Sequence, residues 1–148
     1  MKKLLALLLA LCMVFALCAC GTTPTEPEES TEASGNPVVK IGIFEPASGD
    51  NGAGGKQETL GVQYANSVCP TVDIDGTTYD VELVAVDNES SNDKAPSAAS
   101  TLVNAGVSIV LGSYGSSVSI AGGPTFEAAG IPVMGITCTN PQIGRAHV

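Results

Sequence analysis

The sequence predicts an α/β domain built around a parallel β-sheet over residues 38–142, preceded by an export leader and a polar tether. Three observations support this fold class. From residue 38 onward, short apolar segments alternate with stretches of helical periodicity, which is typical of βαβ units. Loops rich in glycine and serine follow the first and third apolar segments. Residues 20–37, by contrast, contain hardly any apolar side chain and are not expected to fold.

The first 19 residues have the pattern of a secretory signal peptide. Two lysines precede a nearly unbroken apolar run at residues 4–17, shorter than the roughly 20 apolar residues that a membrane-spanning helix needs. The run ends in Leu-Cys-Ala-Cys, which resembles the lipobox of bacterial lipoproteins, with Cys20 as the acceptor of diacylglycerol. This pattern predicts that residues 1–19 are removed and that residues 20–37 form a flexible tether behind a lipid anchor.

Four apolar segments are expected to form the strands of the sheet. A turn is predicted in front of the second of them, where Asp75 is followed by Gly76. The second segment alternates apolar and polar side chains at its start, and the third reads as a buried strand. The predicted strands are residues 38–44, 79–86, 107–111 and 131–135.

The first helix is predicted over residues 56–68, after a glycine-rich loop at residues 48–55. Leu60, Tyr64 and Val68 recur at the helical period and form one apolar stripe. A helix beside a sheet turns its apolar stripe towards the core. We therefore expect this stripe to pack on the sheet.

Two further helices are expected in the second half of the chain. Asp93 fits the N-cap of a helix whose alanines and leucine have helical spacing, and Gly106 is expected to close it. The other helix is predicted over residues 118–129, where a Gly-Gly-Pro run at residues 122–124 weakens the helical pattern.

The charge balance and the cysteine content narrow the function classes. Six basic residues stand against fifteen acidic ones, and removal of the leader takes two of the basic ones. Because nucleic-acid binding depends on clustered lysine and arginine, this composition excludes a nucleic-acid partner. Of the five cysteines, only Cys69 and Cys138 fall in the predicted domain; they could pair, but the sequence does not establish the geometry. No spacing matches a zinc site, and no cofactor is indicated.

Three predicted loops follow strands of the parallel sheet, at residues 45–55, 112–119 and 136–141. In open parallel sheets, ligands bind outside the carboxyl ends of the strands, so these loops are expected to meet in one site. They carry small hydroxyl side chains and free backbone amides, which can hold an anion without a buried counter-charge. The loops therefore favour a small ligand with a carboxylate.

Catalytic and metal-binding roles find little support in the sequence. Ser116 could be a nucleophile, but the chain has no credible histidine base and no nucleophile-elbow pattern. Asp87, Glu89 and Asp93 could suggest a metal loop, but they lack the glycine-centred spacing of a calcium site and fit a helix-capping loop better. We therefore expect neither an enzyme nor a metal site.

Four runs, taken in order, resemble the type I periplasmic binding proteins of the leucine/isoleucine/valine class. The similarity covers residues 39–141 and implies the first half of lobe 1 of that family's two-lobed fold. The runs are the first strand with its glycine-bearing turn at residues 40–55, Val-Leu-Gly-Ser-Tyr-Gly-Ser-Ser at 110–117, Glu-Ala-Ala-Gly-Ile-Pro-Val at 127–133 and Thr-Cys-Thr-Asn-Pro at 137–141.

The resemblance also implies a ligand site. On the matching positions, Ser116 and Thr139 take the α-carboxylate of an amino acid, and the carbonyl of Thr137 faces its ammonium group. Cys138 lies between the two threonines. Gly54 falls where some family members carry an aromatic residue over the side-chain pocket, so the side-chain preference is left open.

The function implied by the resemblance is an extracytoplasmic solute-binding lipoprotein, anchored by lipid to the cell membrane, that passes a branched-chain or related amino acid to the permease subunits of an ABC importer. Amides, urea and short peptides are alternative ligands. A sensory receptor domain of the same fold and a structural surface lipoprotein without a small ligand remain open. The chain is expected to be an N-terminal fragment. Residues 143–148, which match the translation of a common sequencing adapter, are expected to be read-through.

Overall fold

The computed structural model describes residues 35–143 of the chain. The predicted signal peptide, the predicted lipidation residue Cys20 and most of the predicted tether lie outside the described residues, as do residues 144–148 at the other end. Between residues 35 and 143, no helix is long and apolar enough to cross a membrane.

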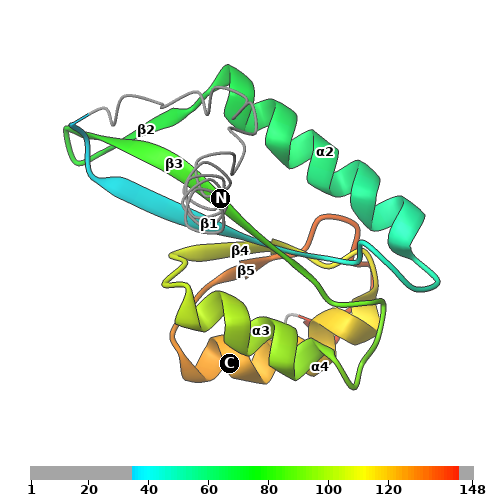
Figure 1. The fold of residues 1–148 in the computed structure, drawn as a ribbon. Helices are drawn as coiled ribbons and strands as arrows, with labels where there is room; N and C mark the ends of the chain where they lie inside the picture. The colour runs from blue at the N-terminus through cyan, green and yellow to red at the C-terminus, as the bar shows by residue number, and fades with distance from the viewer. Residues whose placement is uncertain (1–34, 144–148) are drawn as a thin grey trace, which may run out of the picture. The chain divides into compact units, whose positions relative to one another are not determined.

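A mixed five-stranded sheet forms the centre of the domain. Its strands are β1 (Val38–Glu45), β2 (Thr71–Ile74), β3 (Thr77–Asp87), β4 (Ile109–Gly112) and β5 (Val133–Met134). They lie in the order β2-β3-β1-β4-β5 (Figure 1). β1 pairs in parallel with β3 on one side and β4 on the other, and β5 extends the parallel part beyond β4. The predicted α/β class with a parallel sheet is confirmed.

The turn predicted at Asp75 and Gly76 is confirmed, but it joins two strands. Both residues have positive φ, 50° and 79°, as expected of the tight turns that close β-hairpins. The hairpin pairs β2 with β3 in antiparallel register. The sequence analysis missed β2 because its four residues are the shortest stretch over which alternation can be recognised.

Helices cover both faces of the sheet. α2 (Gly52–Val68) lies over one face, and α3 (Ala95–Asn104) and α4 (Ser116–Ala128) lie side by side over the other (Figure 1). All three predicted helices are present, although α2 begins at Gly52 and not at residue 56, and α4 begins at Ser116 and not at residue 118. Both helices therefore start closer to the strands that precede them than predicted.

Two residues that were expected in the tether, Asn36 and Pro37, are bonded to β3. The Asn36 side-chain amide donates a hydrogen bond to Asp80 Oδ1 at 3.1 Å. The carbonyl of Pro37 accepts a hydrogen bond from the backbone amide of Asp80 at 2.9 Å. These bonds hold Asn36 and Pro37 against the sheet, so both residues pack with the described domain.

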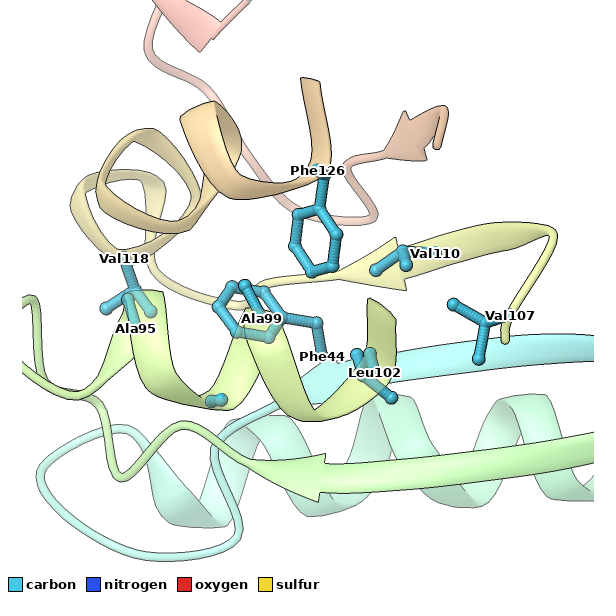
Figure 2. Packing of buried hydrophobic residues seen from close by; sticks show 9 residues of the cluster. Phe44, Ala95, Ala99, Leu102, Val107, Val110, Val118 and Phe126 are labelled. Atoms are coloured by element: carbon cyan, nitrogen blue, oxygen red, sulfur yellow. The ribbon is translucent and has the colours of Figure 1, made fainter. Parts of the chain in front are cut away.

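The main core lies between the sheet and the layer of α3 and α4 (Figure 2). The rings of Phe44 on β1 and Phe126 on α4 meet edge to face, with centroids 5.4 Å apart and an interplanar angle of 84°. A Cβ at Gly122 would lie 2.8 Å from the ring of Phe44. The glycine that weakens the helical pattern of α4 is therefore the residue that lets this helix approach β1.

The prediction that Leu60, Tyr64 and Val68 pack on the sheet is wrong. These residues are 56%, 73% and 61% exposed. The side of α2 that faces the sheet is offset by two positions, about 200° around the helix. It carries smaller side chains such as Val62 and Ala65, which border a cavity. The large apolar residues marked the wrong face because size and period alone do not say which side of a helix meets the sheet.

The prediction that Asp93 caps α3 is also wrong. Lys94 occupies the cap position in a helical conformation, and no side chain caps this helix. Ser91 fixes the entry of α3: its carbonyl accepts a hydrogen bond from the amide of Ala95 at 3.0 Å, and its hydroxyl accepts one from the amide of Lys94 at 3.4 Å. Gly106 follows the end of α3 as predicted, with a φ of 74°.

Candidate functional site

The candidate site lies at the edge of the sheet where the parallel strands end. Loops follow β1, β4 and β5 at this edge, and α2 and α4 begin there. The carboxyl ends of parallel strands share one edge, so the three loops predicted to meet are brought together. Hydrogen bonds between residues 23 to 25 positions apart join the loop after β4 to the loop after β5.

Ser116 and Thr139 are neighbours in the structure. Ser116 Oγ accepts hydrogen bonds from the backbone amides of Thr139, at 3.2 Å, and Asn140, at 3.4 Å. Ser116 is the first residue of α4, so its side chain lies at the positive end of that helix dipole. No group in the described range 35–143 is hydrogen-bonded to the Thr139 hydroxyl, which leaves that hydroxyl free beside Ser116.

Thr137 and Cys138 connect the loop after β5 to the loop after β4. Thr137 Oγ1 donates a hydrogen bond to the carbonyl of Tyr114 at 3.5 Å, and Cys138 Sγ donates one to the carbonyl of Ser113 at 3.0 Å. Cys138 does not pair with Cys69, since both cysteines are free. The thiol of Cys138 therefore holds the two loops together through a hydrogen bond.

Gly54 lies against the ring of Tyr114. A Cβ at Gly54 would be only 2.4 Å from Tyr114 Cε2. The aromatic side chain next to Gly54 is therefore that of Tyr114, from the loop after β4. The start of α4 contains Ser116, and together with the loop after β4 it contacts the other residues predicted to bind ligand, namely Gly54, Thr137, Cys138 and Thr139.

Asn88 is a site residue that the sequence analysis missed. It is fully buried, and its Nδ2 donates hydrogen bonds to the carbonyl of Phe44 at 3.1 Å and to Ser113 Oγ at 3.0 Å. Its Oδ1 accepts a hydrogen bond from the amide of Ser90 at 3.1 Å. One side chain thereby joins the ends of β1 and β3 to the loop after β4. In the sequence, Asn88 stands in a polar run typical of a surface loop, so no local signal marks its burial.

Asp87, the last residue of β3, organises the loop after β1. Its Oδ1 accepts hydrogen bonds from the amides of Ala47 and Glu89, both at 2.8 Å, and its Oδ2 accepts one from the Ser48 hydroxyl at 2.7 Å. Burial alone raises the pKa of Asp87, but these hydrogen bonds outweigh it and hold the pKa below the usual 3.8. This stabilisation is present above pH 3.8 and is lost as the pH falls below it. Asp87 therefore stabilises the loop after β1, whereas it was expected only as part of a helix-capping loop.

Glu45, the last residue of β1, is a buried acid and only 3% exposed. Its Oε2 accepts a hydrogen bond from the amide of Tyr114 at 2.7 Å. Burial, and then contact with the carboxyl of Glu58 on α2, raise the pKa of Glu45 from 4.5 to about 8, and the bond from Tyr114 offsets only part of this. Sequence reasoning placed Glu45 at the start of a binding loop without giving it a role.

A cavity of about 500 Å³ lies between α2 and the sheet. Its walls are mostly apolar, with Ile41, Val62 and Val81 from three different elements. Of the residues that line it, only Ile136 comes from the loops at the carboxyl edge. An apolar cavity offers few groups that could hold a charged solute, so we place the candidate site at the loops and not in this cavity.

The loops offer neutral hydrogen-bond donors around a helix N-terminus. Amides in the first turn of α4 have no acceptor within the helix, and the positive end of the dipole favours an anion. The Ser116 oxygen already accepts two amides, so its own hydrogen remains available to donate. This arrangement can hold a carboxylate without a buried cation.

The fold and the site agree with a known family. The sequence model of the family described as periplasmic binding protein matches residues 38–147, and the chain belongs to this family. No curated protein matches the chain.

Two similar structures are amino-acid-binding proteins. The leucine-binding protein LivK of Thermotoga maritima is 32% identical with a TM-score of 0.66, over 72% of this chain and 29% of that one. LivJ of Streptococcus pneumoniae, a branched-chain amino acid transporter substrate-binding protein solved with isoleucine, is 28% identical with a TM-score of 0.65, over 74% of this chain and 32% of that one. The chain therefore spans less than a third of the length of either protein.

A third similar structure shares the fold at lower identity. It is a solute-binding protein of an ABC transporter from Rhodopseudomonas palustris BisB5, solved with 3,4-dihydroxybenzoic acid. It is 20% identical with a TM-score of 0.65, over 74% of this chain and 30% of that one. The predicted resemblance to the leucine/isoleucine/valine class is confirmed.

Proposed function

We propose that this chain belongs to the solute-capturing component of an ABC importer and holds the carboxylate of a branched-chain or related amino acid at Ser116 and Thr139. The observation that carries the proposal is the bonding of Ser116 Oγ to the amides of Thr139 and Asn140 at the N-terminus of α4. Hydroxyl and amide donors from two separate loops gather there. Neutral donors at a helix end suit a carboxylate.

The ligands of two similar structures support a carboxylate as the common feature. Isoleucine is bound in the S. pneumoniae protein, and 3,4-dihydroxybenzoic acid in the R. palustris protein. Both molecules carry a carboxylate, but only isoleucine carries an ammonium group. On this proposal, the Thr137 carbonyl faces the ammonium group, Cys138 keeps the loop in shape, and Tyr114 beside Gly54 borders the side-chain pocket.

Ser116→Ala and Thr139→Ala are each expected to weaken binding of L-isoleucine by about tenfold to more than a hundredfold. Each removes a hydrogen bond to a charged group, worth about 1.5–3 kcal/mol. Isothermal titration calorimetry measures the change. Ser108→Ala is the matched control, because Ser108 is exposed just before β4, at the opposite edge of the sheet. Affinities that are equal in the wild type and both site variants would place the ligand elsewhere.

We propose further that residues 38–142 work as the first half of lobe 1 of a longer protein. The chain spans 29% of LivK and 32% of LivJ, and the candidate residues Thr137 and Thr139 are exposed. A ligand held on an open face lacks most of the enclosure of a binding pocket. Calorimetry should therefore compare two proteins, the full-length product of the intact gene and the present chain. Sequencing genomic DNA past residue 142 tests this proposal and the origin of residues 143–148.

We also propose that Cys20 carries a lipid that anchors the protein outside the cytoplasm. The support is the Leu-Cys-Ala-Cys end of the apolar run and the polar tether behind it. Growth with a radioactive fatty acid is expected to label the wild type and not Cys20→Ala. Cys69→Ala, which removes an exposed cysteine of the folded part, is expected to keep the label. Label retained in Cys20→Ala would contradict the anchor.

A further inference from the structure

Glu45 and Glu58 face each other between β1 and α2. Side chains alternate along a strand, so Ile41 and Glu45 point to the α2 face of the sheet, whereas Phe44 points into the core under α3 and α4. The carboxyl of Glu58, on α2, lies next to that of Glu45, at a distance where a hydrogen bond forms once one of the two is protonated. Two acidic side chains from different elements therefore meet beside the candidate site.

Neither carboxyl has enough hydrogen-bond donors. Oε1 of Glu45 and both carboxyl oxygens of Glu58 are buried, and no donor from the part of the chain that the structure describes reaches them. Ionised carboxylates only accept hydrogen bonds, so two of them in contact would stay unpaired and repel each other. A single proton resolves both problems, because a protonated carboxyl donates a hydrogen bond to its neighbour.

The loop after β4 is built around the Glu45 carboxyl. Glu45 Oε2 accepts the amide hydrogen of Tyr114 at 2.7 Å. Gly112 has a φ of 121°, and a Cβ there would lie 2.6 Å from Glu45 Oε1 and 2.4 Å from the carbonyl oxygen of Phe44. The carbonyl of Tyr114 in turn accepts a hydrogen bond from Thr137. The position of the Glu45 carboxyl is thus linked to both loops of the candidate site.

We propose that Glu45 and Glu58 hold one proton between them and act as the positioning residues that keep the loop after β4 in its ligand-binding shape. The part that concerns ligand binding rests on the proposed function. With the proton in place, Glu45 remains fixed on Tyr114. When the proton leaves, two adjacent buried negative charges repel. The amide of Tyr114 bonds a charged acceptor more strongly, but burial and the contact with Glu58 outweigh this gain. Separation of the two carboxylates then withdraws the support of the loop that leads to Ser116.

Other ionisable groups around Glu45 are engaged elsewhere. Asp87 stands beside Glu45 in the register of β1 and β3, but its carboxylate accepts hydrogen bonds from the loop after β1. Cys138, from the loop after β5, donates its thiol hydrogen to a backbone carbonyl. The ring of Tyr114 lies over the start of α2. Lys40, nearer the other end of β1, pairs with an acid of β3 at 3.7 Å.

Glu45 and Glu58, here called the acid pair, link the stability of the fold to pH. The pKa of Glu45 is about 8 in the folded chain, against 4.5 for an unperturbed carboxyl. Between these values, the folded chain holds a proton that the unfolded chain has lost. The contribution of Glu45 to stability therefore falls as the pH rises from 4.5 to about 8 and changes no further above it. The same rise in pH is expected to loosen the loop after β4.

Titration of the full chain by NMR tests the shared proton. The amide signal of Tyr114 is expected to shift with a midpoint near pH 8 in the wild type, because its acceptor gains charge. In Glu58→Gln, this midpoint is expected to move to lower pH, because glutamine carries no charge and donates a hydrogen bond to the ionised Glu45, while burial still keeps the pKa above 4.5. Glu127→Gln, on an exposed part of α4, is expected to keep the wild-type midpoint. A wild type without the midpoint, or a Glu58→Gln variant that retains it, would overturn the proposal.

Calorimetry with L-isoleucine on the product of the intact locus tests the positioning role. Between about pH 7 and pH 9, the wild-type affinity is expected to fall by about tenfold more than that of Glu58→Gln, the loss expected when one hydrogen bond of the site is disrupted. The comparison cancels the ionisation of isoleucine itself. An equal fall in both proteins would overturn the positioning role. If isoleucine binds at neither pH, the proposed function fails, and the Tyr114 titration still decides whether the acid pair controls the loop.

Discussion

Phe44→Ala is expected to lower the free energy of unfolding by about 3–5 kcal/mol, the usual loss for a buried phenylalanine. Phe44 is 1% exposed, and its ring packs edge to face against Phe126 between β1 and α4 (Figure 2). Truncation removes this contact and leaves a space that the helices fill only by moving. Chemical denaturation followed by circular dichroism measures the difference.

Tyr64→Ala is the matched control for this substitution. Tyr64 is also a large aromatic residue, but it is 73% exposed on the outer side of α2. Its removal is expected to change the free energy of unfolding by no more than about 0.5 kcal/mol. If Tyr64→Ala lowers the free energy of unfolding as much as Phe44→Ala does, the observed orientation of α2 is contradicted. The result would then support the predicted packing of Tyr64 on the sheet.

Asn88→Ala is expected to lower the free energy of unfolding by about 2–4 kcal/mol, since each buried polar group left without a partner costs about 1–3 kcal/mol. The carbonyl of Phe44 and the hydroxyl of Ser113 lose the bonds from Asn88, and the amide of Ser90 loses its acceptor. Within residues 35–143, the Ser113 oxygen keeps only the bond from the Gly115 amide at 3.4 Å. Ser113 begins the loop after β4, so the same substitution is expected to increase amide hydrogen exchange at Tyr114. Denaturation and exchange measured by mass spectrometry report the two effects.

Asn104→Ala controls for the loss of an asparagine as such. Asn104 is exposed at the end of α3, where its removal should change stability and exchange little. Unfolding free energies that agree between Asn88→Ala and Asn104→Ala would show that the buried amide does not hold the strand ends together. Unchanged exchange at Tyr114 in Asn88→Ala would show that the loop is supported by other groups.

Several elements of the fold were predictable because they depend on residues close together in the chain. Asp75 and Gly76 adopt the positive φ values of a tight turn. Gly106, which follows the end of α3, also has a positive φ. The apolar segments that became β1 and β4 pair in the centre of the sheet. Local composition, turn chemistry and period were sufficient for these assignments.

The meeting of Ser116 and Thr139 was also predictable, for a different reason. Parallel strands place their carboxyl ends at one edge, so loops that follow such strands come together whatever their separation in sequence. The family resemblance then selected the residues within those loops. Their contact is observed, at 3.2 Å from Ser116 Oγ to the Thr139 amide, whereas their role towards a ligand stays a prediction.

By itself, the sequence determined the α/β class, the helices and parallel strands, and the edge at which the candidate site lies. Only the tertiary structure decided which side of α2 meets the sheet, that Asn88 is buried, and that Glu45 meets Glu58. Asn88 bonds partners 44 and 25 residues away, and no pattern around it in the chain reports them. Local periodicity sets where a helix or strand forms, but burial and the pairing of polar groups depend on how distant elements pack, because the partners of a buried group come from other parts of the chain.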